Sequence, residues 1–431
     1  MGRTARDNRD LPHPRPVQKI QLSEEHTRRR FIAVILLLLI GGGALAYAFS
    51  QFLSPQAGWQ EIQANTGEGI TCADEFVFLY DLGSGGVSAP VEGRAVTTLY
   101  TQACRRAYQA FHTMEGFEEL GNLWDVNRRP NEAVAVDELL YRAFETVQRS
   151  GDRTLYLGPV YERYEDLLYC TDDSQLVDFD PRASDAVRAE YAAYAAYAMD
   201  PQSIDVELLG DGQVRLYVSE EYLAFAEQAG ISRFLDFGWL KNAFVADYLA
   251  QVMEDSGYTR GAVSSYDGFV RNLDSRGQTY TLNLLDRLAA DRPIQAGSME
   301  YQGPMSLVSL RSFPAGGGDE RRFYQLRDGQ VRTMYLDPAD GLCRNAVDSM
   351  VCYSQDRSCA EIALEAAPVY IADEILEEPL RGLTDRNVQF VYCADQTFVV
   401  SDPELVLTNL YRTGEVEYSV VDMSGPGNYS D

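Results

Sequence analysis

A long apolar run near the N-terminus constrains this chain more than any other feature of its sequence. The run extends from Phe31 to Phe49, contains no charged residue, and is followed by its next charge only at Glu61. A helix of about 20 apolar residues spans the hydrocarbon core of a bilayer. A soluble core helix would show a polar face, which this run lacks. The sequence therefore predicts a transmembrane helix.

Arginine residues on the N-terminal side of this run set its predicted orientation. Residues 1–30 contain eight Lys or Arg and four Asp or Glu, a net charge of +4, and Arg28–Arg30 adjoin the run. Positively charged flanks stay on the cytoplasmic side of a membrane. We therefore expect a single-pass cell-membrane protein with a cytoplasmic N-terminus. The predicted segments are a basic tail (1–30), a transmembrane anchor (31–53), a linker (54–74) and an extracytoplasmic domain (75–431).

A cleaved signal peptide is the alternative interpretation of the same run. Ala44, Leu45 and Ala46 would form a cleavage site of the A-x-A type. The tail ahead of the run is long for a signal peptide, which favours the anchor. Both interpretations place the main domain outside the cytoplasm.

The predicted domain is strongly acidic. The net charge of the chain is −28, so the part after residue 30 carries −32. Such a domain repels nucleic-acid phosphates and anionic lipid head groups, and we expect no nucleic-acid partner. Lys19 and Lys241 are the only lysines, which makes Lys241 conspicuous.

Cysteine and histidine contents argue against several kinds of site. All seven cysteines follow the apolar run, but none forms a C-x-x-C pair, so a structural zinc site is not expected. Cys352 and Cys359, or Cys343 with either, could pair as disulfides, although spacing assigns no connectivity. His112 is the only histidine in the domain, which argues against a multi-histidine metal site. Any metal would be a hard cation held by oxygen ligands.

Hydrophobic periodicity predicts a mixture of helices and strands that do not strictly alternate. Helices are expected at 95–114, 137–149, 185–199, 243–255 and 358–371. Strands are expected at 75–80, 234–237, 262–265, 280–285, 305–310 and 347–353, and hairpins over 204–218, 322–336 and 388–400. This order is typical of an α+β fold with mixed, largely antiparallel sheets and packed helices.

Three segments combine turn residues with polar groups in ways that suit a binding site. Leu235–Tyr258 is predicted to be a strand end, a glycine turn and a helix that opens beside Lys241. A helix N-terminus with a nearby lysine favours an anion. Tyr335–Gly341 is an Asp-Pro turn closed by glycine, and Trp124–Asp152 is an asparagine-containing loop followed by a helix.

A fourth segment, Ser358–Ala367, places Glu361 and Glu365 four residues apart on one helix face. Each of these features also has a purely structural interpretation. The two glutamates could form a solvated helix face, and Asp247 could be a first-turn residue favoured by the helix dipole. Asp337 begins an ordinary Asp-Pro turn signal.

The order and spacing of the four segments resemble the ApbE-type FAD:protein FMN transferases, which are membrane-tethered flavin transferases outside the cytoplasm. The family motifs read roughly LDLGGIAKGYAVD, H-I-I-D-P-x-T-G and A-D-A-L-A-T. The matching positions here are Leu235, Asp236, Gly238 and Asp247, then Asp337, Pro338 and Gly341, then Ala360. The loop and helix through Asp152, followed by Gly158-Pro159, resemble a fourth family segment. The resemblance spans roughly residues 75–400.

The sequence departs from the family at positions that face the ligand. Asn242 stands where the family has a lysine, with Lys241 one residue earlier. Met334 replaces the histidine of the second motif, and Tyr266–Asp267 stand near the position of a glycine pair. Two glutamates take the positions of the family's metal-binding Asp and Thr. These changes predict that transferase activity is reduced or lost.

The resemblance implies a function and a set of site residues. The expected function is a membrane-anchored, extracytoplasmic flavin-nucleotide-binding domain that uses FAD and Mg²⁺ and, if active, transfers FMN to an extracytoplasmic protein partner. The alternative is a non-catalytic envelope protein-interaction module that keeps only the fold. The implied residues are Asp247 for catalysis, Asp236, Gly238, Lys241, Asn242 and Asp337 for cofactor binding, and Glu361 and Glu365 for the metal.

Overall fold

The computed structural model of this chain describes residues 56–431 except 66–71, 290–291, 317–321, 415 and 424–431. The predicted basic tail and transmembrane anchor therefore lie outside the described residues. Within the described ranges, no helix is both long and apolar enough to cross a membrane. The chain from Gln56 onward forms one unit by its internal contacts.

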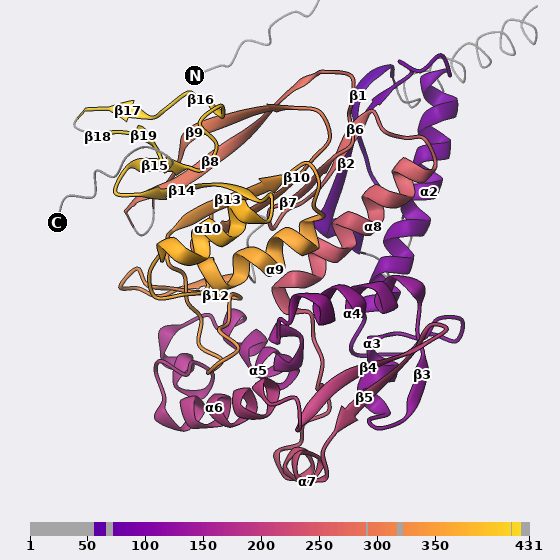
Figure 1. The fold of residues 1–431 in the computed structure, drawn as a ribbon, viewed down its shortest axis with the longest axis vertical. Helices are drawn as coiled ribbons and strands as arrows, with labels where there is room; N and C mark the ends of the chain where they lie inside the picture. The colour runs from indigo at the N-terminus through magenta and orange to yellow at the C-terminus, as the bar shows by residue number, and fades with distance from the viewer. Residues whose placement is uncertain (1–55, 66–71, 290–291, 317–321, 415, 424–431) are drawn as a thin grey trace, which may run out of the picture. The chain divides into compact units, whose positions relative to one another are not determined.

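One large sheet is the centre of this unit (Figure 1). Among the described residues it has nine strands in the order β1-β2-β6-β7-β10-β13-β14-β15-β19. Neighbouring strands pair antiparallel, except that β19 runs parallel to β15. The prediction of an α+β fold with largely antiparallel sheets is confirmed. The strands are β1 (Gly58–Ile62), β2 (Phe76–Leu82), β6 (Gly261–Ser265), β7 (Phe269–Asn272), β10 (Met305–Arg311), β13 (Ser349–Ser354), β14 (Gln389–Ala394), β15 (Thr397–Val400) and β19 (Ser419–Asp422).

Helices pack on this sheet and form the main hydrophobic core with it (Figure 1). They include α2 (Ala89–Phe111), α8 (Lys241–Asp255) and α9 (Cys359–Tyr370), while α4 (Glu138–Ser150) packs against α2 and α9. In α2, the buried residues Val96, Tyr100, Ala103 and Ala107 recur at helical spacing, so one face of the helix is apolar. α8 contacts both α2 and α9 and also lies on β6 and β7.

A second hydrophobic core lies on the opposite face of the sheet. Side chains alternate along a strand, so Met350 of β13 belongs to the main core while Val351 belongs to the second. The second core packs Leu307 and Val351 of the large sheet against Leu284 and Met299 of a separate sheet. That sheet has the order β16-β9-β8, formed by β16 (Val406–Thr408), β9 (Arg292–Gln302) and β8 (Thr279–Ala289).

A third group of elements lies at the lower end of the view in Figure 1. Its helices are α3 (Leu123–Arg128), α5 (Gly158–Leu168), α6 (Asp185–Met199) and α7 (Glu220–Ala229), with the sheet β3 (Ala133–Ala135), β5 (Gln213–Val218) and β4 (Ile204–Gly210). The remaining elements are α10 (Glu377–Asp385), β11 (Phe323–Gln325), β12 (Val331–Thr333), β17 (Arg412–Thr413), β18 (Val416–Glu417) and the 3₁₀ helices η1 (Cys72–Glu75), η2 (Thr154–Leu157), η3 (Asp173–Asp178) and η4 (Gly238–Leu240).

Most predicted elements are confirmed, but two predictions need correction. The predicted strand at 234–237 is wrong, because its main chain bonds to a side chain instead of a neighbouring strand. Asn127 Oδ1 accepts hydrogen bonds from the amides of Phe234 and Leu235, and its Nδ2 donates to the Leu235 carbonyl. The predicted linker at 54–74 contains β1, which pairs with β2, so the ordered domain begins earlier than expected.

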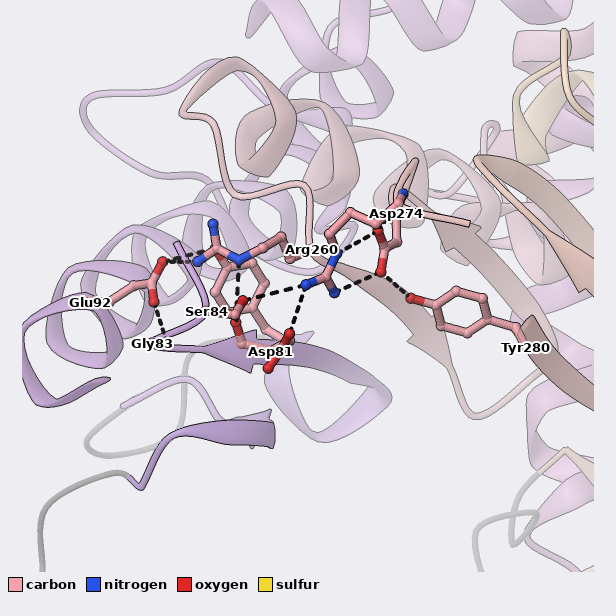
Figure 2. A network of polar contacts seen from close by, with 9 residues as sticks. Asp81, Gly83, Ser84, Glu92, Arg260, Asp274 and Tyr280 are labelled. Carbon is pink, nitrogen blue, oxygen red and sulfur yellow. Dashed lines mark hydrogen bonds and ion pairs between the residues drawn. The ribbon is translucent and has the colours of Figure 1, made fainter. Parts of the chain in front are cut away.

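Two linked polar clusters lie at the end of β2 (Figure 2). In the first, Glu92 of α2 is 7% exposed and accepts hydrogen bonds from the Tyr80 hydroxyl and the Gly83 amide. Its carboxylate also pairs with the Arg260 guanidinium. A buried carboxylate needs such partners, because burial of an unpaired charge is costly.

In the second cluster, Arg276 bridges two carboxylates from different parts of the chain. Its Nη1 lies 2.7 Å from Asp81 Oδ2, and its Nη2 lies 2.8 Å from Asp274 Oδ2. The Tyr280 hydroxyl of β8 donates to the same Asp274 oxygen at 2.7 Å. Hydrogen bonds from Arg276 lower the pKa of Asp274 from 3.8 to about 2. This cluster therefore ties β8 to the end of β2.

Asp274→Asn is expected to destabilise the protein in a pH-dependent way. The folded pKa lies below the unfolded value, so the charged Asp274 contributes stability above about pH 4 that is lost as pH falls through about 2. The gap in pKa corresponds to about 2.5 kcal/mol at pH 6 and to roughly half of that at pH 3. Urea unfolding of wild type and variant at both pH values measures this difference.

The matched control is Asp255→Asn, because among the described residues the Asp255 carboxylate accepts one hydrogen bond, from exposed Gln251. It should leave the free energy of unfolding within about 0.5 kcal/mol at either pH. If the difference in free energy of unfolding between wild type and Asp274→Asn were the same at pH 6 and pH 3, the low pKa of Asp274 would be contradicted.

Candidate functional site

A cavity of about 520 Å³ opens where η1, the end of α2 and the first turn of α8 meet. Four of the residues expected to bind a cofactor line it: Asp236, Gly238, Lys241 and Asn242. The cavity is also lined by Asp267 and Met334. These residues lie at or near two positions where the sequence departs from the ApbE pattern. The structure therefore brings together segments that are far apart in the sequence.

The turn at Gly238 places the first residues of α8 at the cavity. Gly238 has φ +51°, and a Cβ there would lie 2.3 Å from the Tyr161 ring, so only glycine fits. Asp236 Oδ1 accepts the Gly238 amide hydrogen bond at 2.8 Å, and Asp236 Oδ2 lies 3.1 Å from Arg233. The chain then enters α8 directly at Lys241.

Four side chains form a polar cluster in this cavity. Glu75 Oε1 lies 3.4 Å from Lys241 Nζ, and Glu75 Oε2 accepts a hydrogen bond from Asn242 Nδ2 at 2.8 Å. The same Nδ2 donates to Asp267 Oδ2, also at 2.8 Å. Asn242 thus holds two carboxylates apart, and Lys241 neutralises one of them.

The charges of this cluster shift one another's pKa. Burial raises the pKa of Glu75, but Lys241 and Asn242 outweigh burial and leave it below its ordinary value. Burial lowers the pKa of Lys241, but the Glu75 carboxylate outweighs burial and leaves it raised. Burial raises the pKa of Asp267, which Arg322 and Asn242 only partly oppose. Glu75 and Lys241 therefore remain a charged pair.

Several buried polar atoms around the cavity have no hydrogen-bond partner among the described residues. They are Asn242 Oδ1, Asp267 Oδ1, Trp239 Nε1 and Arg322 Nη1. All four residues line the cavity. Since an unsatisfied buried polar group costs about 1–3 kcal/mol, such groups call for a ligand or ordered water. The set offers two acceptors and two donors.

Aromatic rings form much of the remaining wall. Trp239 and Tyr335 meet edge to face with centroids 5.3 Å apart. Phe111 and His112 of α2 and Phe323 of β11 also line the cavity. Burial lowers the pKa of His112, so its imidazole is neutral at pH 7. Flat apolar surfaces beside a few unpaired polar atoms are typical of a small-molecule site.

Asp247, the expected catalytic residue, does not line this cavity. Its Oδ1 accepts hydrogen bonds from Arg271 and from the amide of Cys359, and its Oδ2 accepts from the amide of Ala360. These amides belong to the N-terminus of α9, where a negative charge is favourable. Burial raises the pKa of Asp247, although Arg271 and both amides oppose this.

The residues implied by the resemblance do not all line one cavity. Glu361 caps the N-terminus of α9, and Glu365 pairs with Arg386, and both line a different cavity. Asp337 pairs with Arg344 and does not line the 520 Å³ cavity. In the described part of the chain, no cluster of three His, Cys, Asp or Glu side chains could hold a metal. The predicted pair itself does not fit Mg²⁺, because Glu361 bonds to the N-terminus of its own helix and Glu365 is paired with Arg357 and Arg386.

Sequence reasoning missed Glu75, Trp239 and Arg322 as cavity residues. Glu75 was placed only at the start of a predicted strand, and its contact with Lys241 spans 166 residues. Trp239 directly follows Gly238 of the predicted binding turn, and this position could have indicated that Trp239 lines the cavity. Arg322 was assigned only to a hairpin.

Asp247→Asn is expected to lower the free energy of unfolding by about 3 kcal/mol. The amide would direct N–H groups at existing donors and leave Arg271, which is 22% exposed, without its counter-charge. Urea unfolding measures the loss, and Asp255→Asn in the same helix is the control, expected within about 0.5 kcal/mol of wild type. Unchanged stability of Asp247→Asn would contradict this structural role.

Comparison with known proteins identifies the fold of this chain. No protein-family model and no curated protein matches the chain. Among solved structures, the ApbE protein of Thermotoga maritima is similar at 13% identity, with a TM-score of 0.53 over 81% of this chain and 97% of the other. The flavin transferase ApbE of Vibrio cholerae is similar at 13% identity, with a TM-score of 0.53 over 82% and 98%. The chain therefore has the ApbE fold.

Proposed function

We propose that this protein binds a flavin nucleotide, FAD, in the 520 Å³ cavity, and that its FMN transferase activity is reduced or lost. The observation that carries the proposal is the set of unpaired buried polar atoms in an aromatic cavity. A cavity of this volume lies in the range that holds small molecules and cofactors. Trp239, Phe323 and Tyr335 offer flat faces to an aromatic ring system.

The unpaired atoms fit the polar edge of such a ligand. Asn242 Oδ1 and Asp267 Oδ1 can accept hydrogen bonds, while Trp239 Nε1 and Arg322 Nη1 can donate them. Lys241 and Arg322 supply positive charge for a phosphate, although Lys241 is held by Glu75. When bound, FAD would supply the phosphoanhydride that a transferase cleaves.

The proposed loss of transferase activity is supported by the contacts of the expected catalytic and metal-binding side chains. These side chains bond to other parts of the protein. Asp247 bonds to Arg271 and α9, and Glu365 lies 2.8 Å from Arg386 and 3.7 Å from Arg357. Glu361 is a helix cap. Glu365 is thus neutralised by two arginines, and Glu361 uses a carboxylate oxygen for its own helix N-terminus, which weakens both as ligands for a divalent cation. Transfer of a phosphoryl-linked group depends on such a cation.

We expect Trp239→Phe to weaken FAD binding about five-fold. The change removes the indole N–H and keeps an aromatic ring, and one hydrogen bond contributes about 1 kcal/mol. Quenching of flavin fluorescence on titration with the full chain measures the Kd. Glu361→Gln is the matched control, because Glu361 lines the other cavity, and its Kd should equal that of wild type.

A transfer assay on Ser- and Thr-containing acceptor peptides, with and without Mg²⁺, tests the second half of the proposal. We expect no FMN-linked peptide under either condition. Magnesium-dependent transfer would show that activity is retained. Absence of FAD binding up to millimolar concentration would instead favour the non-catalytic interaction module.

We further propose that the domain is extracytoplasmic and anchored by residues 31–53. The support is the uncharged run from Phe31 to Phe49 beside Arg28–Arg30. A reporter that is active only after export, fused after Asp431, should be active in intact cells. Activity of a cytoplasm-dependent reporter at the same position would reverse the orientation.

A further inference from the structure

Two of the seven cysteines adjoin each other beside the cavity. Cys72 is the first residue of η1, and Cys104 lies in the middle of α2. The Cys72 thiol donates to the Cys104 carbonyl oxygen at 3.2 Å, and η1 packs directly against α2. The two residues are only 4% and 0% exposed. Both sulfurs are therefore held on fixed main-chain elements and shielded from solvent.

The other cysteines with described thiol hydrogen bonds contact different groups. The Cys359 thiol donates to carbonyl oxygens of β7 and β10, so it points away from the partners considered in the sequence. The Cys393 thiol donates to Asp286, and the Cys170 thiol, just beyond the end of α5, donates to the Asp166 carbonyl in the last turn of that helix. All seven are free thiols in the described structure.

The environment of Cys72 determines when its thiol can react. A hydrogen bond with the Cys104 thiol, followed by burial, raises the pKa of the Cys72 thiol. The thiolate is the reactive form in disulfide exchange, so the folded protein contains little of it at neutral pH. Reaction is therefore fastest before η1 has packed fully against α2, and the product is protected afterwards.

We propose that Cys72 and Cys104 form a disulfide when the chain folds in an oxidising compartment. The thiolate of Cys72 attacks a small-molecule or protein disulfide and displaces one thiol, which leaves a mixed disulfide. Cys104 then attacks the Cys72 sulfur and displaces the second thiol. Two protein thiols are oxidised, the two electrons reduce the co-reactant disulfide, and its two thiols take up the protons.

This bond would fasten one wall of the cavity. Cys72 lines the cavity, and Glu75 follows it within the same 3₁₀ helix. Glu75 is the residue that holds both Lys241 and Asn242. A link from Cys72 to α2 therefore restrains the carboxylate on which the polar cluster depends. Any effect on flavin binding rests on the proposed function, whereas the bond itself does not.

The first experiment identifies the linked cysteines by mass spectrometry. The full chain is incubated with glutathione disulfide in low urea, free thiols are alkylated in denaturant, and the protein is digested with trypsin. Cleavage at Arg94 separates Cys72 from Cys104, so a link appears as two peptides joined until reduction. We expect that linked pair and five alkylated cysteines. Seven alkylated cysteines, or a link to any other cysteine, would overturn the proposal.

The second experiment measures stability with and without reductant. A disulfide that closes a loop of about 30 residues stabilises the folded state mainly because it reduces the conformational entropy of the unfolded chain. Reductant should therefore lower the wild-type Tm by roughly 5 °C. Cys104→Ala should be insensitive to reductant. Cys352→Ala, which also removes a fully buried thiol, should keep the wild-type response. A wild-type Tm that reductant leaves unchanged would refute the bond, whatever the outcome of the FAD titration.

Discussion

The carboxylate of Asp247 joins three elements on which the rest of the domain depends. It projects from α8, bonds to Arg271 of β7, and accepts the first amides of α9. α8 therefore cannot slide or rotate relative to the sheet without breaking a buried ion pair and a helix cap together. Since Lys241 and Asn242 occupy the first turn of α8, the position of the cavity follows from an interaction outside it.

Sequence reasoning predicted the architecture better than the site. The helices at 185–199 and 358–371 have local signals, because caps at Ser184 and Ser358 and a regular apolar spacing specify them without reference to other segments. The segment at 234–237 has the composition of a strand, but its hydrogen bonds go to Asn127. That partner is remote in sequence, so no local pattern could reveal it.

For the site, the turn from Asp236 through Lys241 and Asn242 was predictable, because glycine and helix-start signals lie in one continuous segment. The resemblance to ApbE predicted side-chain roles less well at positions where this chain has a different residue type. At Glu361 and Glu365, the longer acidic side chains cap a helix and pair with arginines. A family position thus predicts where a residue lies in the fold, while its contacts depend on the neighbours that this chain supplies.

The hydrogen bonds that Asn127 accepts from the Phe234 amide and donates to the Leu235 carbonyl join residues that are 107 and 108 positions apart. Closing so long a loop has an entropic cost that must be met before the bonds can form. We therefore expect the turn at Gly238 to form late in folding, after α3 and the segments between have collapsed. A chain interrupted before that stage would contain most of its helices and hairpins and still lack the 520 Å³ cavity.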